Sequence, residues 1–207
     1  EFLGSQSAQK KYLEEIFPDM VDVLQYNTSS GLFVVLANDA PIDSESKYSG
    51  FFLRDSDPQN KTASNTDLLL ERGSKQLSQN LSISLDNSWS TDFDLAGVGN
   101  RQADNFFYKP YQAALEHRNT AMSNLGYWSP AFILEDHYMD NHQMITYSVP
   151  LMYENEIYGV LGVEIGVNYL SGYFSVQDLD SRLNAGYVLM LEQEDGSYRS
   201  VVGKGAL

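Results

Sequence analysis

The sequence predicts an α+β domain in which helices pack on one face of a single antiparallel sheet of about five strands. Its first segment, residues 7–26, has the apolar spacing of an amphipathic helix. Two strand-like runs in the second half, 144–152 and 158–167, are separated by a hairpin-sized loop at 153–156. Because a hairpin makes its two strands antiparallel, a long helix beside such strands gives the α+β layout.

One long helix and two strands are expected in the first part of the chain. Pro18 lies within the helical pattern from Ser7 to Tyr26 and predicts a kink or a break there. The apolar residues that recur at three- and four-residue steps in this segment are Tyr12, Ile16, Met20, Val23 and Leu24. Residues 32–36 and 48–55 are short apolar runs with turn-forming residues beside them, which favours buried strands.

The middle of the chain gives mixed signals. Residues 67–70 and 75–81 have helical patterns, whereas 89–100 indicate an irregular crossover. A stronger helical pattern covers 107–117, with Pro110 near the first turn, where proline is tolerated.

The last third of the chain predicts further strands. Residues 127–134 are strand-like, and a short helix is expected near 168–174. The runs 187–191 and 198–202 flank another hairpin-sized loop. We expect this last hairpin to begin a second module, and the abrupt ends of the sequence predict that it is cut from a longer protein.

Charge and composition argue against several classes of protein. The 207 residues include 28 acidic and 13 basic side chains, for a formal net charge of −15. Such a surface repels phosphate groups, so nucleic-acid binding and docking on anionic lipids are not expected. The absence of cysteine excludes disulfides, thiolate zinc sites and iron–sulfur clusters. No apolar run is long enough to cross a bilayer.

No catalytic residue, metal or cofactor is expected. The richest run of metal-ligating side chains is EDHYMDNH at 135–142. His137 and His142 are five residues apart, which puts them on different faces of a helix, and no HExxH motif is present. A polar loop between two strands explains this run equally well. The sequence also lacks the Gly-x-Ser-x-Gly motif of a nucleophile elbow.

Aromatic residues give the clearest indication of a binding site. Tyrosine and tryptophan side chains, whose polar groups need partners when buried, gather near the 107–117 helix and two strands. Glu164 lies in an otherwise apolar strand, so it either pairs internally, with Arg54, Arg101 or a lysine, or contacts a ligand. The residues expected to form one pocket are Tyr108, Tyr111, Tyr127, Trp128, Tyr147 and Glu164.

Strand alternation predicts how this pocket is built. Trp128, Tyr147 and Glu164 would point to one face of the sheet, and the helix would cover that face with Tyr108 and Tyr111. A pocket with an aromatic wall, one carboxylate and no arginine suits a small polar ligand that is neutral or cationic. The alternative is that Glu164 pairs internally and the aromatic side chains only fill the core.

Five segments carry a resemblance to a known family: YSGFFLRD at 48–55, FYKPY at 107–111, GYWSP at 126–130, ITYSVPL at 145–151 and YGVLGVEI at 158–165. In this order they resemble the double Cache (tandem PAS-like) sensor domains of bacterial transmembrane signalling proteins. The likeness is greatest to those attached to GGDEF diguanylate cyclases or histidine kinases.

The resemblance implies a PAS-like, membrane-distal module on the extracytoplasmic side of a bacterial membrane. Residues 1–31 would be a signalling helix that also forms a homodimer, 32–183 the ligand-binding module, and 184–207 the beginning of a membrane-proximal module. In members that sense amino acids, an Arg-x-Trp-Tyr stretch holds the carboxylate and an acid in the last strand holds the amine. Here the stretch is Asn-Phe-Phe-Tyr at 105–108, without the arginine, and Glu164 takes the place of the acid.

Two functions of other classes stay open at this point. One is a secreted carbohydrate-active or metal-dependent hydrolase that uses Glu164 or the 135–142 run. The other is an interaction module without a small ligand. Metal analysis would test the first, and a Glu164→Gln variant that loses stabilisation by a ligand would argue against the second.

Overall fold

The structure is a computed structural model of the chain. It describes residues 2–42, 44–60, 62, 64–98, 100–133, 143–174, 179, 185–193 and 195–205. The 135–142 run and most of the segment that joins α4 to β10 lie outside these residues.

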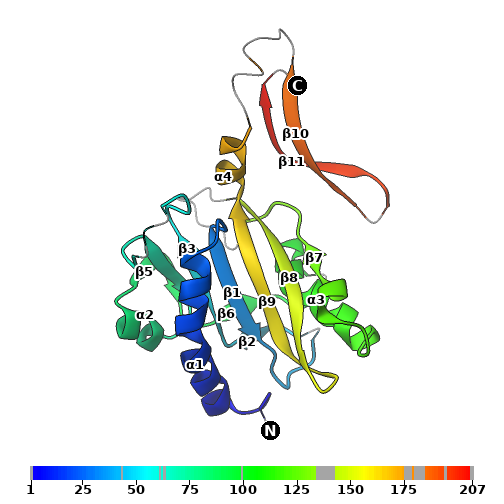
Figure 1. Ribbon diagram of the computed structural model, residues 1–207. Helices are drawn as coiled ribbons and strands as arrows, with labels where there is room; N and C mark the ends of the chain where they lie inside the picture. Colours follow the sequence, from blue (N-terminus) through cyan, green and yellow to red (C-terminus); the bar gives the residue numbers. More distant parts are fainter. Residues whose placement is uncertain are drawn as a thin grey trace.

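A seven-stranded sheet forms the body of the domain, with the strand order β5-β4-β3-β1-β9-β8-β7 (Figure 1). All neighbouring strands are antiparallel except β4 and β5, which are parallel. The predicted α+β class is therefore confirmed, although the sheet has seven strands rather than about five. The strands are β1 (Gly31–Leu36), β3 (Gly50–Asp55), β4 (Leu68–Arg72), β5 (Ser84–Ser90), β7 (Tyr127–Trp128), β8 (Met144–Tyr153) and β9 (Glu156–Gly166).

The parallel edge results from a segment that the sequence patterns misassigned. Residues 67–70 were expected to be helical, but Leu68 begins strand β4, and both Leu68 and Leu70 are buried against the helix α1 side of the sheet. The helix α2 (Lys75–Leu81), where a helix was predicted, connects β4 to β5. A parallel neighbour requires such a crossover, because a tight turn can only reverse the chain.

Helix α1 (Gln6–Gln25) covers one face of the sheet. Leu13, Phe17, Val21 and Leu24 are buried at spacings of three and four residues, so the predicted helix is present. The buried stripe differs from the expected one, because Tyr12 and Val23 are exposed. The Phe17 ring packs edge-on against Phe51 of β3 at a centroid distance of 5.0 Å. The helix continues through Pro18 without a break.

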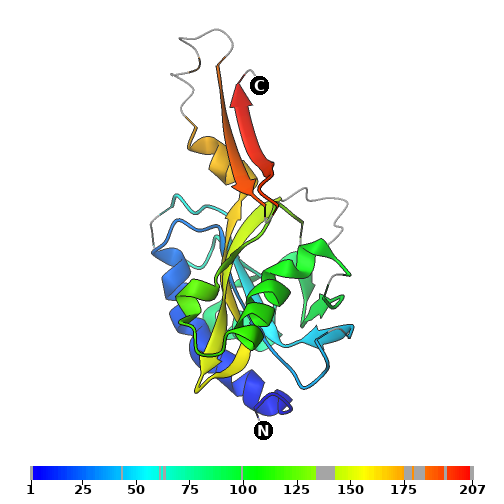
Figure 2. The same ribbon diagram turned by 90° about the vertical axis from the view of Figure 1, so that its right-hand side faces the viewer.

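Helix α3 (Asn105–Glu116) lies on the opposite face of the sheet (Figure 2). The expectation that the helices share one face is therefore wrong. Pro110 is the sixth residue of this helix, beyond the first turn. The same side carries the two-stranded sheet of β2 (Ser46–Tyr48) and β6 (Phe93–Leu95), and the 3-10 helices η1 (Gln102–Asp104) and η2 (Met122–Leu125).

The two predicted hairpins are present. Glu154 and Asn155 connect β8 to β9, with φ values of 50° and 63°, as a two-residue hairpin turn requires. After β9, α4 (Val167–Gly172) leads toward the β10 (Gly186–Glu192) and β11 (Tyr198–Gly205) hairpin. The predicted 127–134 strand is shorter than expected, since β7 ends at Trp128 and Phe132 forms only an isolated bridge.

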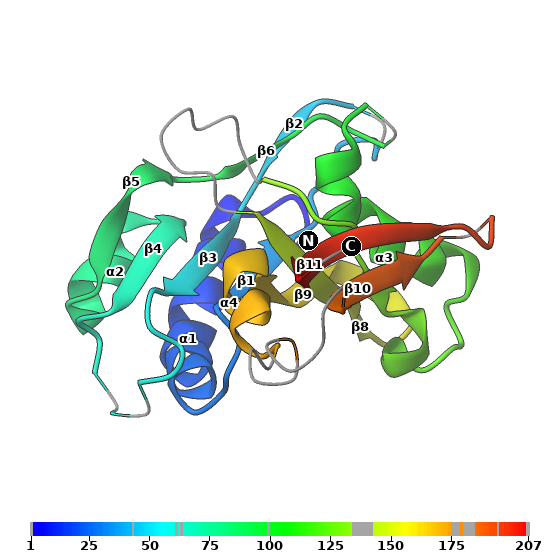
Figure 3. The same cartoon turned by 90° about the horizontal axis from the view of Figure 1, so that it is seen from above.

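The C-terminal hairpin stands beyond the end of the main sheet (Figure 1). Seen from above, it lies over the β8 and α3 side of the molecule, away from β4 and β5 (Figure 3). Ile145, Val167 and Val201 form a small apolar cluster between the sheet, α4 and this hairpin. The division of the chain at about residue 184 into two modules stays a prediction.

Candidate functional site

The register of the sheet separates the residues expected to form one pocket. Glu164 of β9 is opposite Thr146 of β8, so the next residue, Tyr147, points to the other face of the sheet. Tyr147 instead pairs with Trp128 across β7 and β8, with ring centroids 5.0 Å apart. The expectation that Trp128, Tyr147 and Glu164 share a face is therefore wrong.

The two tyrosines of α3 lie in the core on the same side as Glu164, but they make their own contacts. The Tyr108 hydroxyl accepts a hydrogen bond from the amide of Gly97 at 2.9 Å and contacts the Tyr48 hydroxyl. Burial raises the pKa of Tyr108 well above its usual value, so it is a neutral phenol. Tyr111 stacks on Phe107 at 5.4 Å. These contacts stabilise α3 on the sheet.

Phenylalanine side chains fill the space between the sheet and α3, where the pocket was expected. The remaining cavity has a volume of about 10 Å³, room for a single water molecule. Phe106 packs edge-on against Phe33 at 5.0 Å and stacks on Phe132 at 5.8 Å. The described lining of the cavity consists of Phe33, Phe52, Phe93, Phe106, Phe132, Met144 and Thr146.

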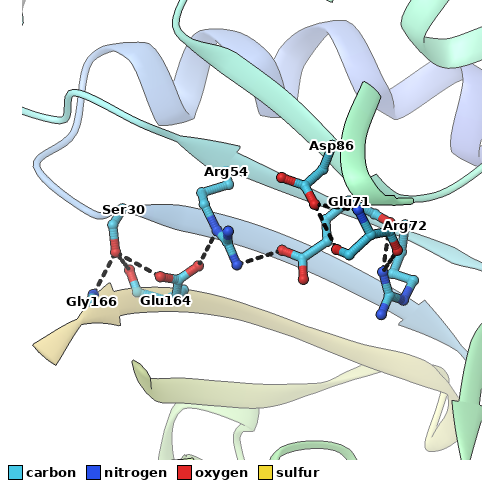
Figure 4. A network of polar contacts seen from close by, with 8 residues as sticks. Ser30, Arg54, Glu71, Arg72, Asp86, Glu164 and Gly166 are labelled. Carbon is cyan, nitrogen blue, oxygen red and sulfur yellow. Dashed lines mark hydrogen bonds and ion pairs between the residues drawn. The ribbon is translucent and has the colours of Figure 1, made fainter. Parts of the chain in front are cut away.

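Glu164 is fully buried and belongs to a network of charged side chains (Figure 4). Its Oε1 accepts a hydrogen bond from the Ser30 hydroxyl at 3.0 Å, and its Oε2 lies 3.9 Å from Nε of Arg54. Nη2 of Arg54 lies 2.7 Å from Oε2 of Glu71. Of the two roles open for Glu164, the structure thus shows internal pairing with Arg54.

The network continues along β4 toward β5. Nη1 of Arg72 donates to the Glu71 carbonyl at 2.7 Å and to the Ser88 carbonyl at 2.9 Å. Asp86 accepts hydrogen bonds from the amide and hydroxyl of Ser88 at 2.8 and 2.6 Å. Burial raises the pKa of Glu71 to about 7; Arg54 and Arg72 oppose this rise, and Glu164 and Asp86 add to it.

This pKa makes stability depend on pH. The folded state holds the Glu71 proton with a pKa of about 7, against 4.5 for an unperturbed side chain. The contribution is therefore fully present below about pH 4.5 and is lost as the pH rises through 7. We expect the free energy of unfolding of the natural sequence, relative to Glu71→Gln, to fall by about 3 kcal/mol between these values. Urea unfolding across the pH range checks this, and a difference that is independent of pH would contradict it.

An open cleft lies beside Trp128, between the start of α3 and the tip of the C-terminal hairpin. Its volume is about 390 Å³, within the range of small-molecule sites. Tyr127 and Trp128, both expected at the binding site, line it. The full described lining is Gln102, Asn105, Lys109, Tyr127, Trp128, Pro130, Leu191, Glu192, Gln193 and Asp195.

Residues 34–171 match the family model of the methyl-accepting chemotaxis protein-like, first PDC sensor domain. The chain belongs to this family. The match covers α3, β8 and β9, which carry most of the residues that resemble Cache sensors, and it confirms that resemblance. The matched residues include the whole charged network except Ser30, and six of the ten described residues that line the cleft.

Solved structures similar to this chain include the extracellular domain of the putative histidine kinase soHK1S-Z6 and methyl-accepting chemotaxis protein X. The first is 17% identical, with a TM-score of 0.47 and coverage of 97% of this chain and 57% of that one. The second is 13% identical, with a TM-score of 0.46 and coverage of 92% and 57%. The chain thus spans little more than half the length of these proteins. No curated protein sequence matches it.

Two absences concern only the residues of the chain that the structure describes. Among these residues, no helix is long and apolar enough to span a membrane, and no three His, Asp or Glu side chains form a group suited to a metal ion. The 135–142 run lies outside them, so the expectation of no metal stays a prediction.

Sequence reasoning missed Glu71, Arg72 and Ser30. Glu71 follows three leucines, just as Glu164 lies within apolar residues, so a carboxylate in an apolar run was the available signal. The helical pattern at 67–70 hides this signal, because only strand β4 carries the run of leucines into the sheet with Glu71 beside it. In the stretch that resembles the amino-acid motif, Phe106 and Phe107 are core residues and Asn105 lines the cleft.

Proposed function

We propose that this PDC domain senses a small polar ligand, neutral or cationic, that binds in the cleft beside Trp128. The supporting observation is that the cleft is lined from both sides, by the sensor module through α3 and β7 and by the tip of the β10–β11 hairpin. A ligand in this position contacts both parts at once. It therefore favours the arrangement in which they are close together, by as much as its affinity differs between the two arrangements.

The chemistry of the lining supports the ligand class. The Trp128 side chain is 47% exposed, so its ring is available for stacking or for contact with a cation. Among the described lining residues, Glu192 and Asp195 supply two carboxylates and Lys109 one ammonium group. Asn105 and Tyr127 add groups that can donate or accept hydrogen bonds. This balance favours an amine or a hydroxylated compound over a carboxylate.

The sensing domain would serve a receptor larger than this chain. We propose that it lies on the extracytoplasmic side of a bacterial membrane, anchored through segments outside this sequence, and reports to a diguanylate cyclase or a histidine kinase. The exposed Tyr12 and Val23 of α1 support a homodimer through this helix. The sensor family favours this function over that of a hydrolase, and no catalytic role is proposed for any residue.

Thermal unfolding with choline, ethanolamine or glycerol tests the proposal. At a concentration of about 100 times its Kd, a bound ligand stabilises the folded state by about 2.7 kcal/mol. We expect at least one compound to raise Tm, and Trp128→Ala and Glu192→Gln to abolish that rise. The matched control is Trp89→Phe, since the other tryptophan donates to the Gly73 carbonyl away from the cleft. A rise in Tm that survives Trp128→Ala would exclude this cleft as the site.

A further inference from the structure

A continuous chain of polar contacts runs across the sheet from β4 to the start of α4 (Figure 4). Glu71 on β4 contacts Arg54 on β3 at 2.7 Å, and Arg54 contacts Glu164 on β9 at 3.9 Å. Ser30, which directly precedes β1, donates to Glu164 at 3.0 Å. The Ser30 hydroxyl in turn accepts a hydrogen bond from the Gly166 amide at 2.6 Å. Four segments that are distant in sequence are therefore linked through side chains.

The contact between Ser30 and Gly166 lies at the end of β9, the last strand of the seven-stranded sheet in the sequence. Gly166 ends β9 and is the N-cap of α4. Helix α4 packs against β11, and Lys204 of that strand donates to the Ser171 carbonyl at 3.4 Å. A change in the hydrogen bond of the Gly166 amide therefore affects the start of α4, the helix that leads from the sheet toward the C-terminal hairpin.

At the other end of this series of polar contacts is the carboxyl group of Glu71, which titrates near neutral pH. The side chain of Glu71 is 3% exposed. Among the described residues, the charged groups that act on it are Arg54 from β3, Arg72 from its own strand, Glu164 from β9 and Asp86 from β5. A buried carboxylate among other carboxylates takes up a proton more readily than one in water. The pKa of about 7 lies between pH 5 and 8, where few unperturbed side chains change their charge.

We propose that this module also responds to protons. When Glu71 is protonated, Arg54 moves toward Glu164, and the hydrogen bond between the Ser30 hydroxyl and the Gly166 amide changes. Protonation removes the charge on Glu71 but leaves Arg54 positive. Glu164 is then the stronger of the two partners of Arg54, and it is also the acceptor of the Ser30 hydroxyl. The charge state of Glu71 thereby affects the hydrogen bond between Ser30 and the Gly166 amide at the N-terminus of α4. This inference does not depend on a ligand in the cleft.

The Gly166 amide reports this coupling directly. Its ¹⁵N and ¹H chemical shifts are followed between about pH 5.5 and 8.5, in full-length samples of the chain without ligand. We expect a single transition with a midpoint near pH 7. The amide of Gly97, which donates to Tyr108 in another part of the core, is the internal control and should show no such transition.

Two variants separate this coupling from other titrations. Glu71→Gln should abolish the Gly166 transition. Glu164→Gln should move its midpoint to lower pH, because the charge of Glu164 raises the pKa of Glu71. A Gly166 chemical shift that does not change with pH would overturn the proposal. A transition that persists unchanged in Glu71→Gln would overturn it too, because another group, such as a histidine, would then be its cause. Glu164→Gln keeps the test decisive if Glu71→Gln does not fold: an unchanged midpoint then counts against the proposal.

Discussion

Replacement of Arg54 by methionine is expected to lower the free energy of unfolding by about 3–5 kcal/mol at neutral pH. Arg54 lies between two buried carboxyl groups, 2.7 Å from Glu71 and 3.9 Å from Glu164. Methionine fills a similar volume but leaves both carboxyl groups without this cation, and removal of one partner from a buried pair is costly. Denaturant unfolding at pH 7 measures the loss. The loss should shrink at lower pH, because the protonated Glu71 carboxyl group needs no cation.

Arg118→Met is the matched control for this substitution. Its ion pair with Glu156 has an N–O distance of 3.6 Å, but the two side chains are 47% and 64% exposed. Exposed pairs contribute about 0–1 kcal/mol, so this variant should unfold almost as the natural sequence does. Equal losses in the two arginine variants would show that the buried network does not contribute to stability as its geometry indicates.

Phe106→Ala is expected to lower the free energy of unfolding by about 3–5 kcal/mol and to open a binding cavity. The Phe106 ring is buried between Phe33, Phe93 and Phe132, where almost no free volume remains. Its removal leaves an apolar cavity next to the small one that already exists. Such a cavity stays dry and takes up small aromatic molecules. Benzene should therefore raise the Tm of this variant, but not that of the natural sequence.

Tyr153→Ala removes a ring that is 67% exposed at the end of β8 and serves as the control. Its free energy of unfolding should change by no more than about 0.5 kcal/mol. If benzene raised the Tm of the natural sequence as much as it raises the Tm of the Phe106→Ala variant, the space between the sheet and α3 would already be open. The proposal of a ligand site in the cleft would then need to be reconsidered in favour of that space.

The candidate site shows how far sequence patterns reach. The carboxylate in the apolar run at Glu164 correctly indicated a buried charge that needs a partner, and Arg54 was among the partners considered. The ligand role of Tyr127 and Trp128 stays a prediction, now in a different cavity. The prediction of one shared pocket is wrong because Thr146, not Tyr147, is opposite Glu164. A shift of one residue along β8 moves a side chain to the other face of the sheet.

The sequence by itself determined those features that depend on neighbouring residues. The spacing of apolar side chains determined α1, and the Glu154–Asn155 turn between two apolar runs determined the β8–β9 hairpin. Only the tertiary structure decided the parallel edge at β4–β5, the placement of α3 opposite α1, and the contact between Glu71 and Arg54. These depend on strand register and on partners far apart in the chain, where burial overrides local propensity and one residue of register moves a side chain to the other face.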